Sequence, residues 1–230
     1  MSEKPAKPGV IADAEALSGS DAAQARVRAW WRLVPRVLTR PVEVFVALRD
    51  DDEADVDARS EPILAIVIVA GMAAMLLTPA WGTLLDEESL DWIVLAVVTF
   101  IGGLLYGAFG YFLLGFVVWL GARGVGVDTR ARKARQVVAF AALPFALSIL
   151  ITVPAIVLAF GTDWFRTGGA DDGAGRAIVL SIGLAFAIWS LGLLAIGMRT
   201  TFVLPWRGVV GALALAAVFV GALAILPTAL

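Results

Sequence analysis

Apolar residues occur along the chain in five long blocks, separated by short polar connectors. The blocks cover about residues 62–82, 92–120, 137–161, 177–198 and 208–228, and no Asp, Glu, Lys or Arg lies inside any of them. A helix of about 20 residues, rising 1.5 Å per residue, spans the roughly 30 Å hydrocarbon core of a bilayer. The pattern therefore predicts an all-α integral membrane protein built as a bundle of five transmembrane helices.

The chain before the first block divides into three segments, followed by the five-helix transmembrane domain at 62–230. Residues 1–25 are rich in Ala, Pro, Gly, Ser and acids, which is typical of a disordered tail. In 26–49, apolar residues recur at three- and four-residue steps, which predicts two amphipathic interfacial helices, the second starting at Pro41. Residues 50–61 hold seven acidic residues and one Arg, so they are expected to form an acidic linker. The apolar side expected for the second helix consists of Val42, Phe45, Val46 and Leu48.

Lys and Arg are distributed unequally among the connectors. Sixteen of the eighteen lie before the first block or in the connectors 121–136 and 199–207, while 162–176 holds the other two. Cytoplasmic loops of membrane proteins carry the excess of these residues. The N-terminus is therefore predicted to lie in the cytoplasm and the C-terminus outside.

A basic run stands directly before the third block. One interpretation is that it only sets topology. The other is that Asp128 or Thr129 caps a helix lying at the lipid surface, whose cations bind anionic headgroups or a partner. The residues of this run are Arg130, Arg132, Lys133 and Arg135. The same contacts are predicted for a group in the N-terminal helix, namely Arg28, Trp30, Trp31, Arg32 and Arg36.

Small residues and prolines inside the blocks indicate helix packing or hinges. Gly103 and Gly107 have GxxxG spacing, which allows two helices to approach closely, and we expect them to pack within one molecule. Pro144 and Pro154 each remove a backbone hydrogen bond from the third block and permit a kink or a cavity.

The composition of the chain argues against several classes of function. The chain is 60% hydrophobic and only 17% charged, and it contains neither His nor Cys, so the commonest general base and the thiolate and imidazole metal ligands are absent. We expect no catalytic residue, cofactor, metal site or nucleic-acid partner. A coupled carrier normally keeps an ionisable group within its spans, and these blocks have none.

Two functions remain from this reasoning. The first is a non-enzymatic membrane scaffold that organises lipid, a membrane-protein partner or further copies of itself. The second is a passive small-solute transporter or channel, in which polar side chains should gather on facing sides of the helices. Those side chains would be Tyr106, Ser148, Thr152, Ser181 and Ser190.

The order of these features resembles the Yip1 domain family over about residues 30–228. The resemblance is carried by "RPVEVF" at 40–45, the glycine-bearing basic connector "GARGVGVDTRARKARQVVAFAALP" at 121–144, and "IWSLGLLAIGMR" at 188–199. It implies a non-enzymatic multi-pass membrane protein. Eukaryotic relatives are associated with vesicle membranes and Rab-type GTPases, a connection that is not carried over, because the Arg-, Ala-, Gly- and Val-rich composition indicates a prokaryotic plasma membrane. Relatives often have Gly-Tyr where this chain has Ala139-Phe140.

Overall fold

The structure, a computed structural model, describes residues 32–51, 56, 60–78, 91–169, 171 and 173–225. Within these residues the regular structure is helical and no strand occurs, which confirms the predicted all-α class. Three helical stretches are long and apolar enough to cross a bilayer: Trp92–Gly124, Ala131–Ala159 and Ala174–Thr201. They contain the second and fourth predicted blocks and all but the last two residues of the third. The first and fifth blocks form shorter apolar helices in the described part of the chain, Ile63–Leu76 and Trp206–Val218.

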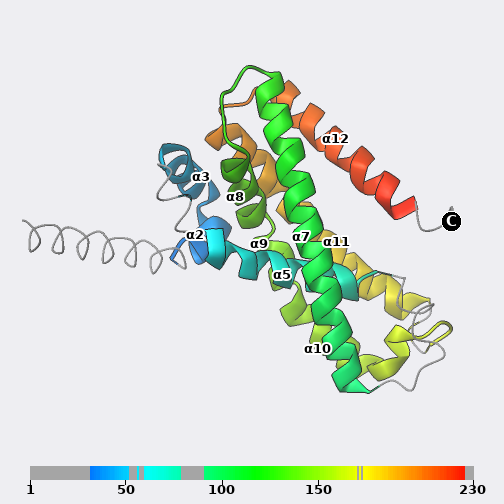
Figure 1. Cartoon of the computed structure of the whole chain (residues 1–230). Helices are drawn as coiled ribbons and strands as arrows, with labels where there is room; N and C mark the ends of the chain where they lie inside the picture. Colours follow the sequence, from blue (N-terminus) through cyan, green and yellow to red (C-terminus); the bar gives the residue numbers. More distant parts are fainter. Residues whose placement is uncertain are drawn as a thin grey trace, which may run out of the picture.

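Helix α7 (Trp92–Gly124) is the longest helix and crosses α5 (Ser60–Leu76), as Figure 1 shows. The crossing depends on glycine because the two backbones touch. A Cβ on Gly71 of α5 would lie 2.0 Å from the carbonyl oxygen of Gly103, and a Cβ on Gly107 would lie 2.4 Å from the carbonyl oxygen of Val67. The small-residue face of α7 therefore packs against the preceding helix of the same molecule.

The third apolar stretch is interrupted twice. It consists of α8 (Ala131–Ala141), α9 (Leu143–Leu147) and α10 (Ile149–Ala159). Pro144 lies in the first turn of α9, directly after the first interruption, and the backbone N–H of Phe145 donates instead to Ser190 Oγ of α11 at 3.1 Å. Helix α11 spans Ala174–Thr201. Pro154 lies inside α10, which continues through it, so only Pro144 coincides with a break.

Two short helices precede the long ones, α2 (Leu33–Thr39) and α3 (Pro41–Asp50). The second starts at Pro41 as expected, while the interfacial position of both helices stays a prediction. Arg40 separates them with a non-helical backbone, and Pro41 begins α3. The apolar side expected for α3 needs one correction, because Val42 is 52% exposed whereas Val44 is buried. Helix α3 is covered by α11 and α8 on two sides, and this wider contact selects Val44 in place of Val42.

The buried apolar residues form two clusters at opposite ends of the bundle. The larger one centres on Phe45, Phe140 and Met198, where α3, α8 and α11 meet. The smaller one contains Leu76, Ile156 and Trp164, the last from the 3-10 helix η2 (Gly161–Phe165). We call the first the basic end and the second the Trp164 end. The last described helix, α12 (Trp206–Ile225), starts at the basic end, contacts α7 there and then diverges from it (Figure 1).

Candidate functional site

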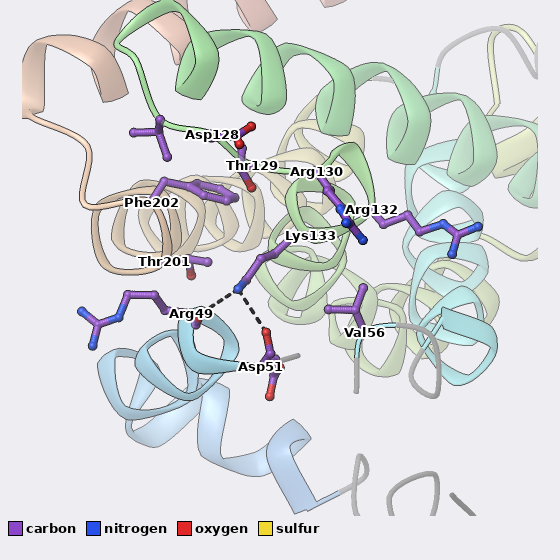
Figure 2. A pocket seen from close by; sticks show the side chains of 11 residues that line it. Arg49, Asp51, Val56, Asp128, Thr129, Arg130, Arg132, Lys133, Thr201 and Phe202 are labelled. Carbon is purple, nitrogen blue, oxygen red and sulfur yellow. Dashed lines mark hydrogen bonds between the residues drawn. The ribbon is translucent and has the colours of Figure 1, made fainter. Parts of the chain in front are cut away.

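A pocket of about 410 Å³ opens at the basic end, where the C-terminal ends of α3 and α11 meet the N-terminal end of α8 (Figure 2). Its walls carry four cations and two carboxylates, together with an apolar part. The chain therefore places an excess of positive charge around a cavity at this end. The lining residues are Arg49, Asp51, Val56, Val127, Asp128, Thr129, Arg130, Arg132, Lys133, Thr201 and Phe202.

Lys133 lines this pocket and reaches from α8 to the end of α3. Its ammonium group donates to the carbonyl oxygens of Arg49 at 2.5 Å and Asp51 at 3.4 Å, which Figure 2 shows as dashed lines. The last carbonyls of a helix have no partner within the helix, and a cation near them is also favoured by the helix dipole. Lys133 thus fixes the end of α3 to the start of α8. Thr201 Oγ1 adds a bond from α11 to the carbonyl oxygen of Phe45 at 3.0 Å.

Gln136 attaches a second point of the acidic linker to α8. Its amide Nε2 donates to the carbonyl oxygen of Val56 at 2.6 Å, and the side chain is buried. Gln136 Oε1 has no hydrogen-bond partner among the described residues. With Lys133 holding Asp51, two separate linker positions contact the same face of α8.

Arg130 and Arg132 lie at the start of α8 and line the pocket, and both are exposed. Arg130 occupies the N-cap position with an extended backbone (φ −92°, ψ 146°), and no side chain caps the helix. The expected cap by Asp128 or Thr129 is therefore wrong. Trp119 Nε1 donates a hydrogen bond to the carbonyl oxygen of Thr129 at 3.0 Å. This bond fixes the connector directly before α8.

Arg135 behaves differently from its neighbours, because it packs against α7. Its guanidinium carbon lies 5.0 Å from the ring centre of Phe112 and 5.7 Å from that of Tyr111, distances typical of cation–π contacts. The absence of a Cβ at Gly115 leaves room for the Arg135 stem. The basic run thus separates into two pocket arginines, one lysine that holds α3, and one arginine that packs on aromatic rings.

The N-terminal candidates do not join the pocket. Arg32 and Arg36 are exposed at the start of and within α2, and neither lines the cavity. Arg28, Trp30 and Trp31 lie outside the described residues. Their predicted contacts with headgroups or a partner stay predictions.

Of the polar side chains expected to line a conduit, Ser148 and Ser190 both bond to the backbone of Phe145 from facing helical segments, while two others lie at the surface. Ser181 and Tyr106 are exposed, and Ser181 donates to the carbonyl oxygen of Ala177 on its own helix. Ser148 and Thr152 are fully buried, and their hydroxyls donate to carbonyl oxygens one turn or less away, those of Phe145 and Ser148. These hydroxyls are therefore occupied within their own helical segments.

Sequence reasoning did not identify the polar cluster at the Trp164 end. Arg176 Nε lies 2.6 Å from Asp171 Oδ2, and Arg176 Nη2 donates to the carbonyl oxygen of Trp164 at 3.0 Å. The guanidinium carbon also lies 5.0 Å from the centre of the Trp164 ring. Trp164 Nε1 in turn donates to the carbonyl oxygen of Leu76 at 2.9 Å. The two charges lie in a connector that holds Asp163, Arg166 and Asp172 as well, so the pattern alone did not select this pair.

Comparison with known proteins identifies the class of the chain. The sequence model of the Yip1 domain matches residues 36–226, which is most of the chain. No curated protein and no solved structure matches.

Proposed function

Because the chain belongs to the Yip1 domain family, we propose that it is a five-span, non-enzymatic scaffold that organises anionic lipid or a partner at the cytoplasmic face of a prokaryotic plasma membrane. The observation that carries this proposal is the basic end, where cations surround a pocket while the apolar helices contain no charged residue in their cores. We therefore place its binding function in the connectors and helix ends that lie outside the apolar cores of the helices.

Tryptophans support the placement of α7 across a bilayer. Trp92 begins the helix and Trp119 lies one turn before its end, and their separation corresponds to about 40 Å at 1.5 Å per residue. A bilayer including its headgroup regions is about 40–45 Å thick, and tryptophan prefers those interfaces. Arg123 lies over the Trp119 ring and Arg199 over the Trp206 ring, as expected where headgroups meet the helices.

Exposed apolar side chains support lipid contact along the long helices. Phe100, Phe109 and Phe112 of α7 are each about half exposed, as are Leu184 and Ile188 of α11. Soluble proteins rarely expose continuous apolar surfaces of this extent. We assign α5 and α12 as the first and fifth spans, because both are apolar and both pack against α7.

The cytoplasmic assignment of the basic end follows from its charge. The described cations of the connectors and helix ends gather there, including Arg123, Arg130, Arg199 and Arg207, whereas Arg166 and Arg176 lie toward the Trp164 end. Cytoplasmic ends carry the excess of Lys and Arg. Reporter fusions test this orientation: a reporter at the C-terminus should be active only outside the cytoplasm, and cytoplasmic activity would contradict five spans.

The proposed non-enzymatic role extends to the pocket. Its hydroxyls belong to Thr129 and Thr201, and Thr201 already donates to a backbone carbonyl of α3. Hydroxyl nucleophiles need a neighbouring general base, and the chain has no histidine. We therefore assign the pocket to binding.

The scaffold proposal is tested by measuring which lipids the full-length protein collects. The protein is reconstituted in vesicles of mixed phosphatidylcholine and phosphatidylglycerol and extracted, and its bound lipids are identified by native mass spectrometry. Enrichment of the anionic lipid over the vesicle composition, decreasing as salt rises, is expected because cations attract anionic headgroups by about 1 kcal/mol each. Bound lipid in the same ratio as the vesicle would contradict the proposal.

A further inference from the structure

We infer that Arg135 holds the phosphate group of an anionic membrane phospholipid on the flank where α8 packs against α7 (Figure 1). This inference rests on the proposed function, because it names one lipid contact of the proposed scaffold. It concerns a site beside the apolar helix α7, and Arg135 is not among the residues that line the pocket.

The guanidinium of Arg135 lies beside an apolar part of α7. In the sequence Arg135 stands outside the apolar blocks, yet its guanidinium carbon lies 5.0 Å from the ring centre of Phe112, inside the second block. Phe112 precedes Trp119 by about 10 Å along the helix, at 1.5 Å per residue. Trp119 is placed at the headgroup level above, and headgroups occupy only about 5–7 Å on each side of a bilayer. The guanidinium therefore reaches the outer part of the hydrocarbon core.

The charge of Arg135 has no acceptor within the part of the chain that the structure describes. Its Nε is buried without a hydrogen-bond partner, and no described carboxylate is paired with it. The recorded interactions of the guanidinium are those with the rings of Tyr111 and Phe112. Such ring contacts use the face of the planar group, whereas its N–H donors lie along the edge. A charged side chain at this depth normally pairs with another group, so the edge requires an acceptor.

The surroundings of Arg135 favour a lipid phosphate as this acceptor. The five apolar blocks contain no Asp or Glu, so the spans of a second copy offer no carboxylate at this depth. Phe109, Phe112 and Phe116 follow one another at three- and four-residue steps on one side of α7, and each is about half exposed. Acyl chains can lie along this side. A phospholipid presents phosphate and acyl chains together, whereas a water-soluble anion would have to leave water.

The charge balance selects among phospholipids. The groups recorded around the Arg135 side chain, Tyr111, Phe112 and Gly115, carry no charge, so the positive charge is not compensated there. A guanidinium donates to two phosphate oxygens in one plane. Phosphatidylglycerol keeps a net negative charge, whereas the choline of phosphatidylcholine neutralises its phosphate. We therefore expect the site to prefer phosphatidylglycerol.

The test measures the first lipid that binds to the full-length protein. Protein in a non-ionic detergent is titrated with phosphatidylglycerol or phosphatidylcholine, and bound lipid is counted by native mass spectrometry. The wild type should bind the first phosphatidylglycerol several-fold more tightly than phosphatidylcholine. Arg135→Gln should weaken this binding by roughly tenfold, because a hydrogen bond to a charged group is lost. The matched control Arg207→Gln removes one exposed cation from the same end and should bind like the wild type.

A second variant keeps the charge and decides the question if Arg135→Gln does not fold. Arg135→Lys should lose roughly three- to tenfold in affinity, because an ammonium group neither donates to two phosphate oxygens in one plane nor stacks on aromatic rings as a guanidinium does. Thermal unfolding is followed with and without phosphatidylglycerol. A lipid that binds the folded protein raises its unfolding temperature, and this rise should shrink in both variants. A purely structural role of Arg135 would lower the unfolding temperature equally with and without lipid.

A spin label tests where the phosphate lies. The chain has no cysteine, so Phe116→Cys and Ile101→Cys each introduce one labelling site at an exposed position of α7. With one equivalent of phosphatidylglycerol, the phosphorus resonance should broaden strongly when the label is at 116. It should broaden little when the label is at 101, because Ile101 lies about 16 Å from Phe112 along the helix. Equal broadening by both labels would contradict the site.

The combined outcomes distinguish this site from the scaffold function. Tighter binding of phosphatidylglycerol that falls in the Arg135 variants and not in Arg207→Gln supports the site. A wild type without lipid preference, or Arg135 variants that bind as well as the wild type, would overturn it. If the wild type then still collects anionic lipid from mixed vesicles, the assignment of Arg135 has failed and the scaffold function stands. If it collects none, the scaffold function has failed as well.

Discussion

Both ends of the bundle contain arginine side chains, but the burial and the surroundings of these side chains differ. At the Trp164 end, Arg176 is enclosed by a carboxylate, a carbonyl oxygen and an aromatic ring, and Asp171 is fully buried. At the basic end, Arg130 and Arg132 are exposed on the wall of a cavity where cations outnumber carboxylates. The first arrangement joins a buried carboxylate to a partly buried arginine and stabilises the fold, although Asp171 Oδ1 has no hydrogen-bond partner among the described residues, whereas the second surrounds an open cavity with charge.

The difference in burial determines how much the charged groups of each end contribute to the stability of the fold. Charges withdrawn from water are costly unless they are paired and hydrogen-bonded, so a buried pair with good geometry depends on both of its members. Exposed charges keep their hydration and contribute little to stability. Variants at the Trp164 end should therefore change folding, whereas variants of the exposed charges at the basic end should change stability little.

The largest effect is expected from Asp171→Ala. It leaves Arg176 without its carboxylate at a site where 25% of the arginine side chain is exposed. Removing one member of a buried ion pair lowers the free energy of unfolding by about 3–5 kcal/mol. Because Arg176 is partly exposed, we expect a loss of about 3 kcal/mol. The free energy of unfolding, measured in mixed detergent micelles, reports the change.

A double variant separates the lost pair from a general weakening of the connector. Asp171→Ala/Arg176→Met removes the unpaired charge as well and should recover part of the loss. Equal stability of Asp171→Ala and the wild type would contradict the structural role assigned to this end.

The second-largest loss of stability is expected at the crossing of α5 and α7, which lies between the two ends. The methyl group in Gly71→Ala would lie 2.0 Å from the carbonyl oxygen of Gly103, so the helices must separate. Overpacking typically costs about 1–3 kcal/mol. Gly110→Ala is the control on α7, because a Cβ at Gly110 meets nothing within 4 Å. Both variants are compared by thermal unfolding in detergent, and equal losses would show that the crossing tolerates separation.

The sequence predicted much of this architecture, because bilayer thickness constrains helix length strongly. The helical class, the break at Arg40-Pro41 and the cores of the three long helices all follow from apolar blocks and proline positions. The close packing at Gly103 and Gly107 followed from GxxxG spacing. The partner glycine, Gly71, was not predicted, because spacing along one helix does not identify the helix that packs against it.

The roles of the basic run could not be separated from sequence alone. Arg130, Arg132, Lys133 and Arg135 have similar side chains within six residues, and only the fold shows that α3 ends beside Lys133 and that Gly115 leaves space beside Arg135. Gln136 was likewise missed, although a polar amide at the start of an apolar block is a signal that a buried acceptor lies nearby. The pocket arises from three segments that are distant in sequence.

Lys133→Met should have a smaller effect that is confined to the basic end. Methionine keeps most of the apolar stem while the donor to the carbonyl oxygens of Arg49 and Asp51 is lost. Because these carbonyls are partly accessible to water, the cost should be about 1 kcal/mol. Amide hydrogen exchange should speed up in α3 and remain unchanged in η2. Arg207→Met, an exposed cation at the start of α12, is the control, and unchanged exchange in α3 would show that Lys133 does not fix this helix.

The smallest effect is expected from Asp50→Ala, which repeats the chemistry of Asp171→Ala at the other end. Both carboxylates lie close to an arginine Nε, Asp50 at 3.0 Å from Arg49 and Asp171 at 2.6 Å from Arg176. The side chain of Asp50 is 64% exposed, however, whereas that of Asp171 is 0% exposed.

Exposed pairs contribute about 0–1 kcal/mol. Asp50 is also the last residue of α3, where the helix dipole disfavours a negative charge by about 0.3–1 kcal/mol. These two terms oppose each other, so the free energy of unfolding should change by less than about 0.5 kcal/mol. The remaining difference should vanish at 1 M salt, where the screening length is about 3 Å. A loss as large as that of Asp171→Ala would mean that burial does not distinguish the two ends.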